Sequence, residues 1–284
     1  MKIYADISKF NFCSELLILG GLLKEIPKQS PENEGRFNGI IEICNNIFEY
    51  VETENEADVV VIPYKFNGTF PETDKPVLAF YNDDDSTTFD LPDNVKLFRT
   101  SLYASKRLPN EFSMPTVSPD YFRGNYLNNP ELSVGYCGHT GHGRLQYLQL
   151  LHFSPIKTDF ILRNGFWAPG VNKLVARNEY FKNISDNIFT FCYRGNGNFS
   201  YRFYETLMMG RIPVLIDTDC VFPIDIEGMC VYCKQGENVI EKIKNFYDSR
   251  NLLEVQKNNR LVWETKMSPG GWLRSLKTEY NLYQ

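Results

Sequence analysis

Strand-like and helix-like segments alternate along most of this chain, and this alternation limits the possible folds more than any other feature. The clearest strand is 58–63, an almost uninterrupted β-branched run of the kind that parallel sheets bury on both faces. Alternation of apolar strands with helices predicts an α/β fold, with parallel sheets covered by helices on both faces. The expected strands are 2–7, 47–51, 58–63, 76–81, 95–98, 132–137, 159–163, 188–193, 212–216 and 229–233.

The proline-rich stretch 109–130 shows little periodicity and divides the chain into two blocks. We therefore expect two facing α/β domains, an N-terminal one over 1–130 and a C-terminal one over 131–284. Helices are expected at 12–26, 144–152, 172–185, 201–209, 237–247, 251–265 and 271–280. The last three helical segments can cross back onto the first domain.

Composition excludes several classes of function. The 284 residues hold 30 Lys and Arg against 35 Asp and Glu, a net charge of −5, so the chain lacks the basic field that nucleic acid requires. The longest apolar run, 16–23, is far shorter than the ~20 residues of a spanning helix. Asp6, Lys9 and Glu15 interrupt any signal-peptide core. We expect a cytoplasmic protein without a membrane span, in the host cytoplasm if the source is viral.

The segment 193–205 carries the strongest functional signal. A strand ends there, Gly195 and Gly197 let the backbone approach a ligand, and Ser200 is a good N-cap for the next helix. The N-terminus of a helix presents free N–H groups and a positive dipole end to whatever lies there. The turn therefore predicts a site for an anion.

Charged side chains flank this turn in a pattern that fits a nucleoside diphosphate. Arg194 and Arg202 place guanidinium groups on either side of the helix end, where they can bind a diphosphate. Glu205 lies three residues after Arg202 on nearly the same helix face, where a carboxylate can accept hydrogen bonds from two ribose hydroxyls.

The same turn also approximates the glycine-rich fingerprint of dinucleotide-binding domains, with Asp217 and Asp219 following ~20 residues later. This alternative predicts an NAD(P)-dependent oxidoreductase. The fingerprint normally opens its domain, however, whereas the strands 132–137 and 159–163 precede it here. Arg194, directly before the turn, also has no role in that alternative.

A second glycine turn, 138–143, leads into a helix that begins at Arg144. Its His139 and His142 lack a nearby third ligand, and this spacing favours hydrogen bonds to a ligand over a metal site. We expect Arg144, together with Arg163 at the end of the neighbouring strand, to contribute to the same diphosphate-binding site.

Three consecutive aspartates, 83–85, contain the Asp-x-Asp pattern by which some nucleotide-sugar enzymes hold a divalent ion. Acidic runs after strands are more often solvated turns. A diphosphate site built from arginines has less need of a metal to neutralise charge. We therefore expect no metal site, and interpret the run as a turn with one carboxylate facing the cleft.

Residues 194–219 read RGNGNFSYRFYETLMMGRIPVLIDTD. This segment closely resembles the core of the exostosin-type glycosyltransferases. The segments 163–170 (RNGFWAPG) and 98–103 (FRTSLY) also look like those of soluble bacterial or viral relatives of that family. The resemblance is densest over about 160–225, and it departs from the family at 222–224, where Phe-Pro-Ile replaces the common Leu-Pro-Phe.

The resemblance implies two Rossmann-like domains in the GT-B arrangement, with a nucleotide sugar on the C-terminal domain. It implies an inverting, metal-independent transfer from a UDP-sugar, such as UDP-xylose, UDP-glucuronate or UDP-galactose, to a glycan or oligosaccharide. No further cofactor is implied. Carried over by position, the diphosphate is held by Arg194, Gly195, Gly197, Ser200 and Arg202, and the ribose by Glu205.

Inversion requires a base that takes the proton of the acceptor hydroxyl. Asp6 at the end of the first strand and Asp84 in the acidic run are the two candidates by position. A rival interpretation is a non-catalytic sugar-nucleotide-binding protein, which kept the donor site and lost its base.

Overall fold

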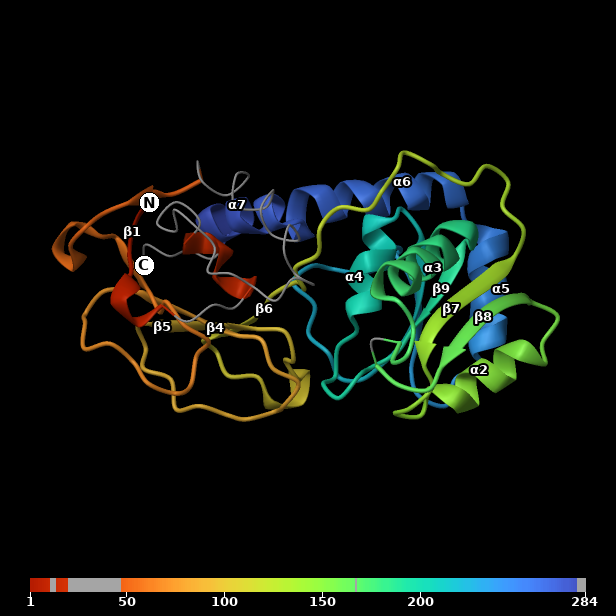
Figure 1. Cartoon of the computed structure of the whole chain (residues 1–284), viewed down its shortest axis with the longest axis horizontal. Helices are drawn as coiled ribbons and strands as arrows, with labels where there is room; N and C mark the ends of the chain where they lie inside the picture. Colours follow the sequence, from red (N-terminus) through yellow and green to blue (C-terminus); the bar gives the residue numbers. More distant parts are fainter. Residues whose placement is uncertain (11–13, 20–46, 167, 280–284) are drawn as a thin grey trace. The chain divides into compact units, whose positions relative to one another are not determined.

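The computed structural model describes residues 1–10, 14–19, 47–166 and 168–279, which fold into two compact units (Figure 1). The first unit comprises Met1–Pro119, the short segment Cys220–Ile224 and the chain from Glu264 onward. The second unit comprises Asp120–Asp219 and Asp225–Trp263. Each unit contains one sheet of parallel strands with packed helices, which confirms the predicted pair of Rossmann-like α/β domains.

The second unit holds a five-stranded sheet in the order β11-β10-β9-β7-β8, with every neighbouring pair parallel. β7 comes first along the chain, and the strand order reverses between β7 and β9. In sheets of this kind, ligands bind beyond the carboxyl ends of the strands at the point of reversal. The strands are β7 (Ser133–His139), β8 (Lys157–Arg163), β9 (Phe189–Cys192), β10 (Ile212–Ile216) and β11 (Val231–Cys233).

Helices cover both faces of this sheet, as the sequence predicts (Figure 1). α2 (Arg144–His152) and α5 (Val239–Ser249) pack apolar side chains into one core with the strands. α3 (Lys173–Asp186) and α4 (Tyr201–Met208) lie on the opposite face. α6 (Leu252–Val262) packs against α4.

The first unit holds a six-stranded parallel sheet in the order β2-β1-β3-β4-β5-β6. α7 (Pro269–Glu279) packs Trp272 and Leu273 on one face of it, and Phe66 and Phe89 from loops pack on the other. The strands are β1 (Lys2–Tyr4), β2 (Glu49–Tyr50), β3 (Val59–Val61), β4 (Val77–Tyr81), β5 (Val95–Arg99) and β6 (Glu111–Ser113).

Short helical turns complete the described chain. They are η1 (Ile7–Lys9), η2 (Ser14–Leu19), η3 (Glu54–Glu56), η4 (Ala104–Lys106) and a π-helical turn, η5 (Trp263–Met267). Of the helix expected at 12–26, the described residues 14–19 form a 3₁₀ helix, and the remainder lies outside the described residues. Throughout the described ranges, no helix combines the length and apolar character needed to cross a bilayer.

The unit boundary at Pro119 differs from the expected boundary after residue 130. The intervening stretch is bonded to the second unit, because the Gln256 side chain exchanges two hydrogen bonds of 2.9 Å with the backbone of Leu127. The Tyr247 hydroxyl also donates to the carbonyl of Pro130, at 2.7 Å. The proline-rich stretch is therefore largely built into the two units, and its first part includes β6, a strand that the sequence analysis missed.

The segment Cys220–Ile224 lies within the sequence of the second unit but belongs to the first. Its Val221 N–H donates to the carbonyl of Leu102 at 2.9 Å, and Cys220 forms an isolated antiparallel bridge with Tyr103. The chain therefore leaves the second unit directly after Asp219 and returns at Asp225.

One buried side chain joins the two ends of the second unit. Arg260 donates to both carboxylate oxygens of Asp120, at 2.8 and 2.6 Å, and its guanidinium lies over the rings of Phe122 and Trp263. Burial acts to raise the pKa of Asp120, but the hydrogen bonds from Arg260 outweigh it and hold that pKa below its usual value. Asp120 is the first residue of the unit and Trp263 the last. Because Arg260 contacts both of them, it holds the two ends of the unit together.

We expect Asp120→Asn to lower the free energy of unfolding by about 1–2 kcal/mol near neutral pH, because it leaves Arg260 buried without its counter-ion. Because the folded pKa lies below the unfolded value of about 3.9, the pair stabilises the fold above that pH. Its contribution is lost as the pH falls through the folded pKa. Urea unfolding should therefore show the variant and wild type converging below about pH 4.

The matched control is Asp186→Asn, which removes an exposed pair with Lys182. Solvent screening predicts a change within about 0.5 kcal/mol. Equal losses in the two variants, or a loss at Asp120 that persists at low pH, would contradict the role given to Arg260.

Candidate functional site

Three arginines follow or flank the loops after β7 and β9, at the carboxyl edge of the second unit's sheet. Arg144, Arg194 and Arg202 form what we call the arginine cluster. Arg144 is the first residue of α2, Arg194 follows β9, and Arg202 lies in the first turn of α4. The cluster therefore lies where the strand order reverses.

Arg144 is hydrogen-bonded to both the end of β7 and the loop after β9. Its side chain is 6% exposed, and it donates from Nη1 to the carbonyl of His139 at 3.0 Å. Nη2 donates to the carbonyl of Arg194 at 2.5 Å. One buried guanidinium therefore fixes the loop after β7 against the loop after β9.

Arg202 reaches from α4 back to the end of β7. Its Nη2 donates to the carbonyl of Cys137 at 2.7 Å, and its guanidinium lies 4.3 Å from the ring centroid of Tyr136 and 5.5 Å from that of Tyr180. A Cβ added at Gly138 would come within 2.6 Å of the same Nη2. The absence of a side chain at Gly138 thus makes room for the guanidinium.

Of the arginine cluster, Arg144 carries a charge that no carboxylate compensates among the described residues. Burial acts to lower the pKa of Arg202, but nearby Tyr180, Tyr136 and Glu205 outweigh it and raise that pKa. Within the described ranges, the three arginines form no ion pair with a carboxylate. The Nε atoms of Arg144 and Arg202 are buried and have no hydrogen-bond partner in the described part of the chain. Burial lowers the pKa of Arg144, and the charge of Arg202 adds to this effect. Buried charges are costly unless they are paired, so this site favours an anion.

The glycine turn after Arg194 leaves space rather than adopting an unusual backbone. Neither Gly195 nor Gly197 has a positive φ. A Cβ at Gly195 would meet only Nη2 of Arg144, at an ordinary 3.8 Å. Arg194 itself donates to the carbonyl of Asn196 at 2.8 Å, so it bonds within its own loop.

Ser200 occupies the expected N-cap position of α4, but its side chain makes no capping hydrogen bond. The predicted N-cap position of Ser200 is therefore correct, but the expected hydrogen bond from the helix backbone to its side chain is not formed. The turn is held instead by the buried Asn198, which donates to the carbonyl of Asp219 at 3.1 Å. Asp219 adopts a positive φ of 60°, and its N–H bonds to the carboxylate of Asp217 at 2.9 Å.

The two carboxylates nearest the arginine cluster already have partners. The Tyr180 hydroxyl of α3 donates a short hydrogen bond to Glu205. Arg163 pairs with Glu179, which holds its guanidinium at the end of β8 beside its register partner His139. Arg163 therefore lies next to the cluster with its charge compensated, unlike Arg144.

Sequence reasoning missed three aromatic residues of the site. Tyr136 and Tyr180 contact Arg202, as described above, and neither belongs to a motif. Phe166 is 44% exposed, and its ring lies 5.0 Å from that of His139 and 5.7 Å from that of His142. Two signals were available for Phe166: its place in the segment 163–170, and its position in the loop after a predicted strand, where ligand contacts concentrate.

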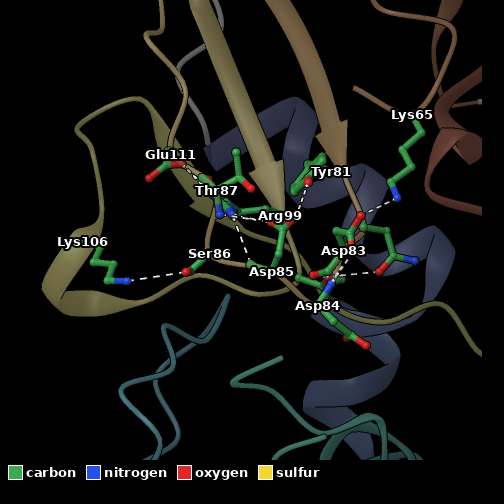
Figure 2. A network of polar contacts seen from close by, with 12 residues as sticks. Lys65, Tyr81, Asp83, Asp84, Asp85, Ser86, Thr87, Arg99, Lys106 and Glu111 are labelled. Carbon is green, nitrogen blue, oxygen red and sulfur yellow. Dashed lines mark hydrogen bonds and ion pairs between the residues drawn. The ribbon is translucent and has the colours of Figure 1, made fainter. Parts of the chain in front are cut away.

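In the first unit, the acidic run lies at the end of β4 within a polar network (Figure 2). Asp83 pairs with Lys65 at 2.6 Å, and Asp85 accepts a hydrogen bond of 2.8 Å from the Tyr81 hydroxyl. Burial, together with the bond to Asp85, raises the pKa of Tyr81 to about 12, so it remains a donor. The side chain of Asp84 is exposed and makes no hydrogen bond or ion pair with the described residues.

A buried ion pair in the core of the first unit helps to hold this acidic run in place. Arg99 and Glu111 are 3% and 1% exposed, and their charged groups lie 2.7 Å apart. Arg99 also donates to the carbonyl of Thr87 at 2.8 Å, which anchors the chain after Asp85 (Figure 2). The position of the run is therefore set by the core of the unit.

Asp6 follows β1, where the strand order of the first unit reverses. Its carboxylate caps the turn Ile7–Lys9, accepting bonds from the Ser8 hydroxyl at 2.6 Å and N–H at 3.2 Å, and pairs with Lys9 at 3.1 Å. The bonds from Ser8, followed by that from Lys9, hold its pKa below the usual value. This carboxylate is consequently a weaker base than an ordinary aspartate.

No group of three or more His, Cys, Asp or Glu in the described part of the chain is placed to hold a metal ion. Of the segment 163–170, Trp167 lies outside the described residues. The sequence-predicted donor residues thus gather in the second unit, whereas Asp6 and Asp84 lie in the first.

No family model and no curated protein matches this sequence. Among solved structures, the chain is similar to the glycosyltransferase SnogD from Streptomyces nogalater, at 15% identity and a TM-score of 0.33, over 64% of this chain and 56% of SnogD. It therefore spans less than two thirds of that structure.

Two further likenesses cover more of the chain. The spinosyn rhamnosyltransferase SpnG with spinosyn aglycone aligns at 10% identity and a TM-score of 0.40, over 78% of this chain and 73% of SpnG. An α1,3-fucosyltransferase with GDP aligns at 13% identity and a TM-score of 0.40, over 92% of this chain and 81% of that one.

We expect Gly138→Ala to lower the melting temperature by several degrees, because the new Cβ must displace the Arg202 guanidinium. The displaced guanidinium loses its hydrogen bond to the Cys137 carbonyl, which costs about 1–3 kcal/mol. Gly195→Ala is the matched control and should leave the melting temperature within about 1 °C, since its Cβ meets only an ordinary contact. Thermal unfolding of both variants without ligand tests this. Equal shifts would show that Arg202 is not held as described.

Proposed function

We propose that this chain is a glycosyltransferase that moves a sugar from a nucleotide diphosphate sugar to a glycan or oligosaccharide. The observation that carries the proposal is the buried Arg144, which has no counter-ion among the described residues and lies beside Arg202. A bound diphosphate supplies the missing negative charge, and guanidinium groups match its geometry.

The chemistry follows from where this charge lies. When the bond between the sugar and the diphosphate breaks, negative charge grows on the departing diphosphate. Fixed positive groups that face the developing charge lower the barrier, because they need no reorganisation. The arginine cluster and the N-terminus of α4 are such groups.

The resemblance of 194–219 to exostosin-type enzymes supports the finer assignment. On that basis the donor is a UDP-sugar, with UDP-xylose, UDP-glucuronate and UDP-galactose as candidates, and the sugar is transferred with inversion. The arginine cluster then replaces a metal ion as the neutralising charge. We place this activity in the cytoplasm.

For the base, the structure favours Asp84 over Asp6. The Asp6 carboxylate is occupied by Ser8 and Lys9, and its lowered pKa makes it a poor proton acceptor. Asp84 is exposed beside two partnered aspartates, in a loop that Arg99 anchors. We therefore assign proton removal from the acceptor hydroxyl to Asp84.

The dehydrogenase alternative is less well supported by the topology. The turn 195–200 follows β9, the third strand of its unit along the chain, whereas a dinucleotide fingerprint follows the first. A sugar-nucleotide-binding protein without catalysis uses the same arginine cluster. It differs from the proposed enzyme only in turnover.

The deciding experiment is a thermal-shift titration with UDP, GDP, CDP and NAD, with and without Mg²⁺, followed by a hydrolysis and transfer assay with UDP-sugars. A ligand that binds the native state raises the melting temperature with the logarithm of its concentration. A rise with UDP that ignores Mg²⁺ supports the proposal. The proposal is overturned if NAD alone raises the melting temperature, or if none of the nucleotides does. UDP binding without turnover favours the non-catalytic sugar-nucleotide-binding protein.

Arg194→Ala should weaken UDP binding about 10- to 100-fold, because it removes one charge-assisted contact to the diphosphate. The melting temperature without ligand should not change, since Arg194 bonds only to carbonyls of its own loop. Arg250→Ala, an exposed arginine beside Phe246 outside the cluster, is the matched control. Calorimetric titration with UDP should show unchanged affinity for it. Full affinity in Arg194→Ala would remove this residue from the site.

Asp84→Asn should lower the transfer rate about 10²- to 10⁴-fold, the usual contribution of a general base, while UDP affinity stays unchanged. Asp83→Asn is the control, because its carboxylate is paired with Lys65. It should keep most of the activity. Steady-state rates with a UDP-sugar and acceptor measure both, and equal rates in the two variants would refute the assignment of the base.

A further inference from the structure

Glu205 and Arg202 are linked through a third residue that the sequence did not single out. The Tyr180 hydroxyl, on α3, donates a hydrogen bond to Oε2 of Glu205. The ring of the same tyrosine lies beneath Arg202, with its centroid 5.5 Å from the guanidinium carbon. Tyr180 therefore contacts both charged side chains of α4.

The hydroxyl of Tyr180 acts only as a donor at physiological pH. Burial raises its pKa well above the usual value, and the nearby charge of Glu205 raises it further. A carboxylate offers about four acceptor positions, so one bond from Tyr180 leaves capacity for other donors. The bond also fixes the side-chain rotamer of Glu205 before a ligand binds. A mobile glutamate would instead lose side-chain entropy when the ligand binds.

We propose that Tyr180 is a positioning residue that sets the preference of the site for ribonucleotides. It holds the Glu205 carboxylate at a fixed place relative to Arg202, so that a ligand whose diphosphate lies on the arginine cluster presents its ribose hydroxyls to the carboxylate. This inference rests on the proposed function, because it requires the arginine cluster to bind a nucleoside diphosphate.

The test compares three ligands by calorimetric titration: UDP, 2′,3′-dideoxy-UDP and pyrophosphate. Wild type should bind UDP about tenfold or more tightly than the dideoxy compound, because hydroxyl bonds to a carboxylate are lost. Tyr180→Phe keeps the ring beneath Arg202 and removes only the hydroxyl. In this variant the preference for UDP should fall to about threefold or less, while pyrophosphate affinity stays within about twofold.

Tyr147→Phe is the matched control. Tyr147 lies on α2 in the same unit, packs against Phe191 and Tyr193, and its hydroxyl makes no hydrogen bond with the described residues. This variant should keep the wild-type preference. A general loss of packing from removing a tyrosine hydroxyl would lower all affinities in both variants and leave the ratio of UDP to dideoxy-UDP unchanged.

The outcomes separate this inference from the function on which it rests. If wild type binds UDP and discriminates against the dideoxy compound, but Tyr180→Phe discriminates equally well, the role of Tyr180 is refuted and the donor site survives. If wild type binds both nucleotides equally, ribose recognition by Glu205 is refuted as well. If wild type binds none of the three ligands, the arginine cluster is not a diphosphate site and both proposals fail.

Discussion

The architecture of the site depends on two guanidinium groups that bond to backbone carbonyls at the ends of parallel strands. Arg144 holds the carbonyls of His139 and Arg194, and Arg202 holds that of Cys137. A parallel sheet leaves such carbonyls without partners where its strands end, and they must be satisfied. Here side-chain cations do so, and the same contacts bring positive charge to the point where the strand order reverses.

This arrangement leaves a charge imbalance in a confined space. Tyr136 and Tyr180 present ring faces to Arg202, which stabilises a cation without neutralising it. Glu179 is paired with Arg163, whereas Glu205 is bonded to the neutral hydroxyl of Tyr180 and keeps its charge near Arg202. The charge of Arg144 in particular has no paired carboxylate among the described residues, and the proposed diphosphate would complement it. The unfilled hydrogen-bonding capacity at Nε of Arg144 and Arg202 agrees with that conclusion.

Much of this structure could be predicted from local patterns. The strands and helices of the second unit lie within a few residues of their expected positions, because apolar runs and glycine turns are local signals. Arg144 and Arg202 could be selected since each follows a strand and a glycine turn. The fold class followed from the same alternation.

Other features depend on contacts between distant parts of the chain, which no local pattern records. Tyr180 lies within a helix and reaches Glu205 only because α3 and α4 share one face of the sheet. The three-residue strand β6 was hidden among prolines. The unused hydroxyl of Ser200 also escaped prediction, since helix propensity fixes the cap position and not the bond.

The short excursion Cys220–Ile224 has a mechanical consequence for the turn that follows β9. Asn198 in that turn is bonded to the carbonyl of Asp219, the last residue before the chain enters the first unit. The next residue, Cys220, bridges to Tyr103 in the backbone of that unit. The peptide bond between Asp219 and Cys220 thus connects the residue that accepts the hydrogen bond from Asn198 to the first unit. The backbone on each side of this peptide bond is therefore fixed within its own unit, by Asn198 on one side and by the bridge to Tyr103 on the other.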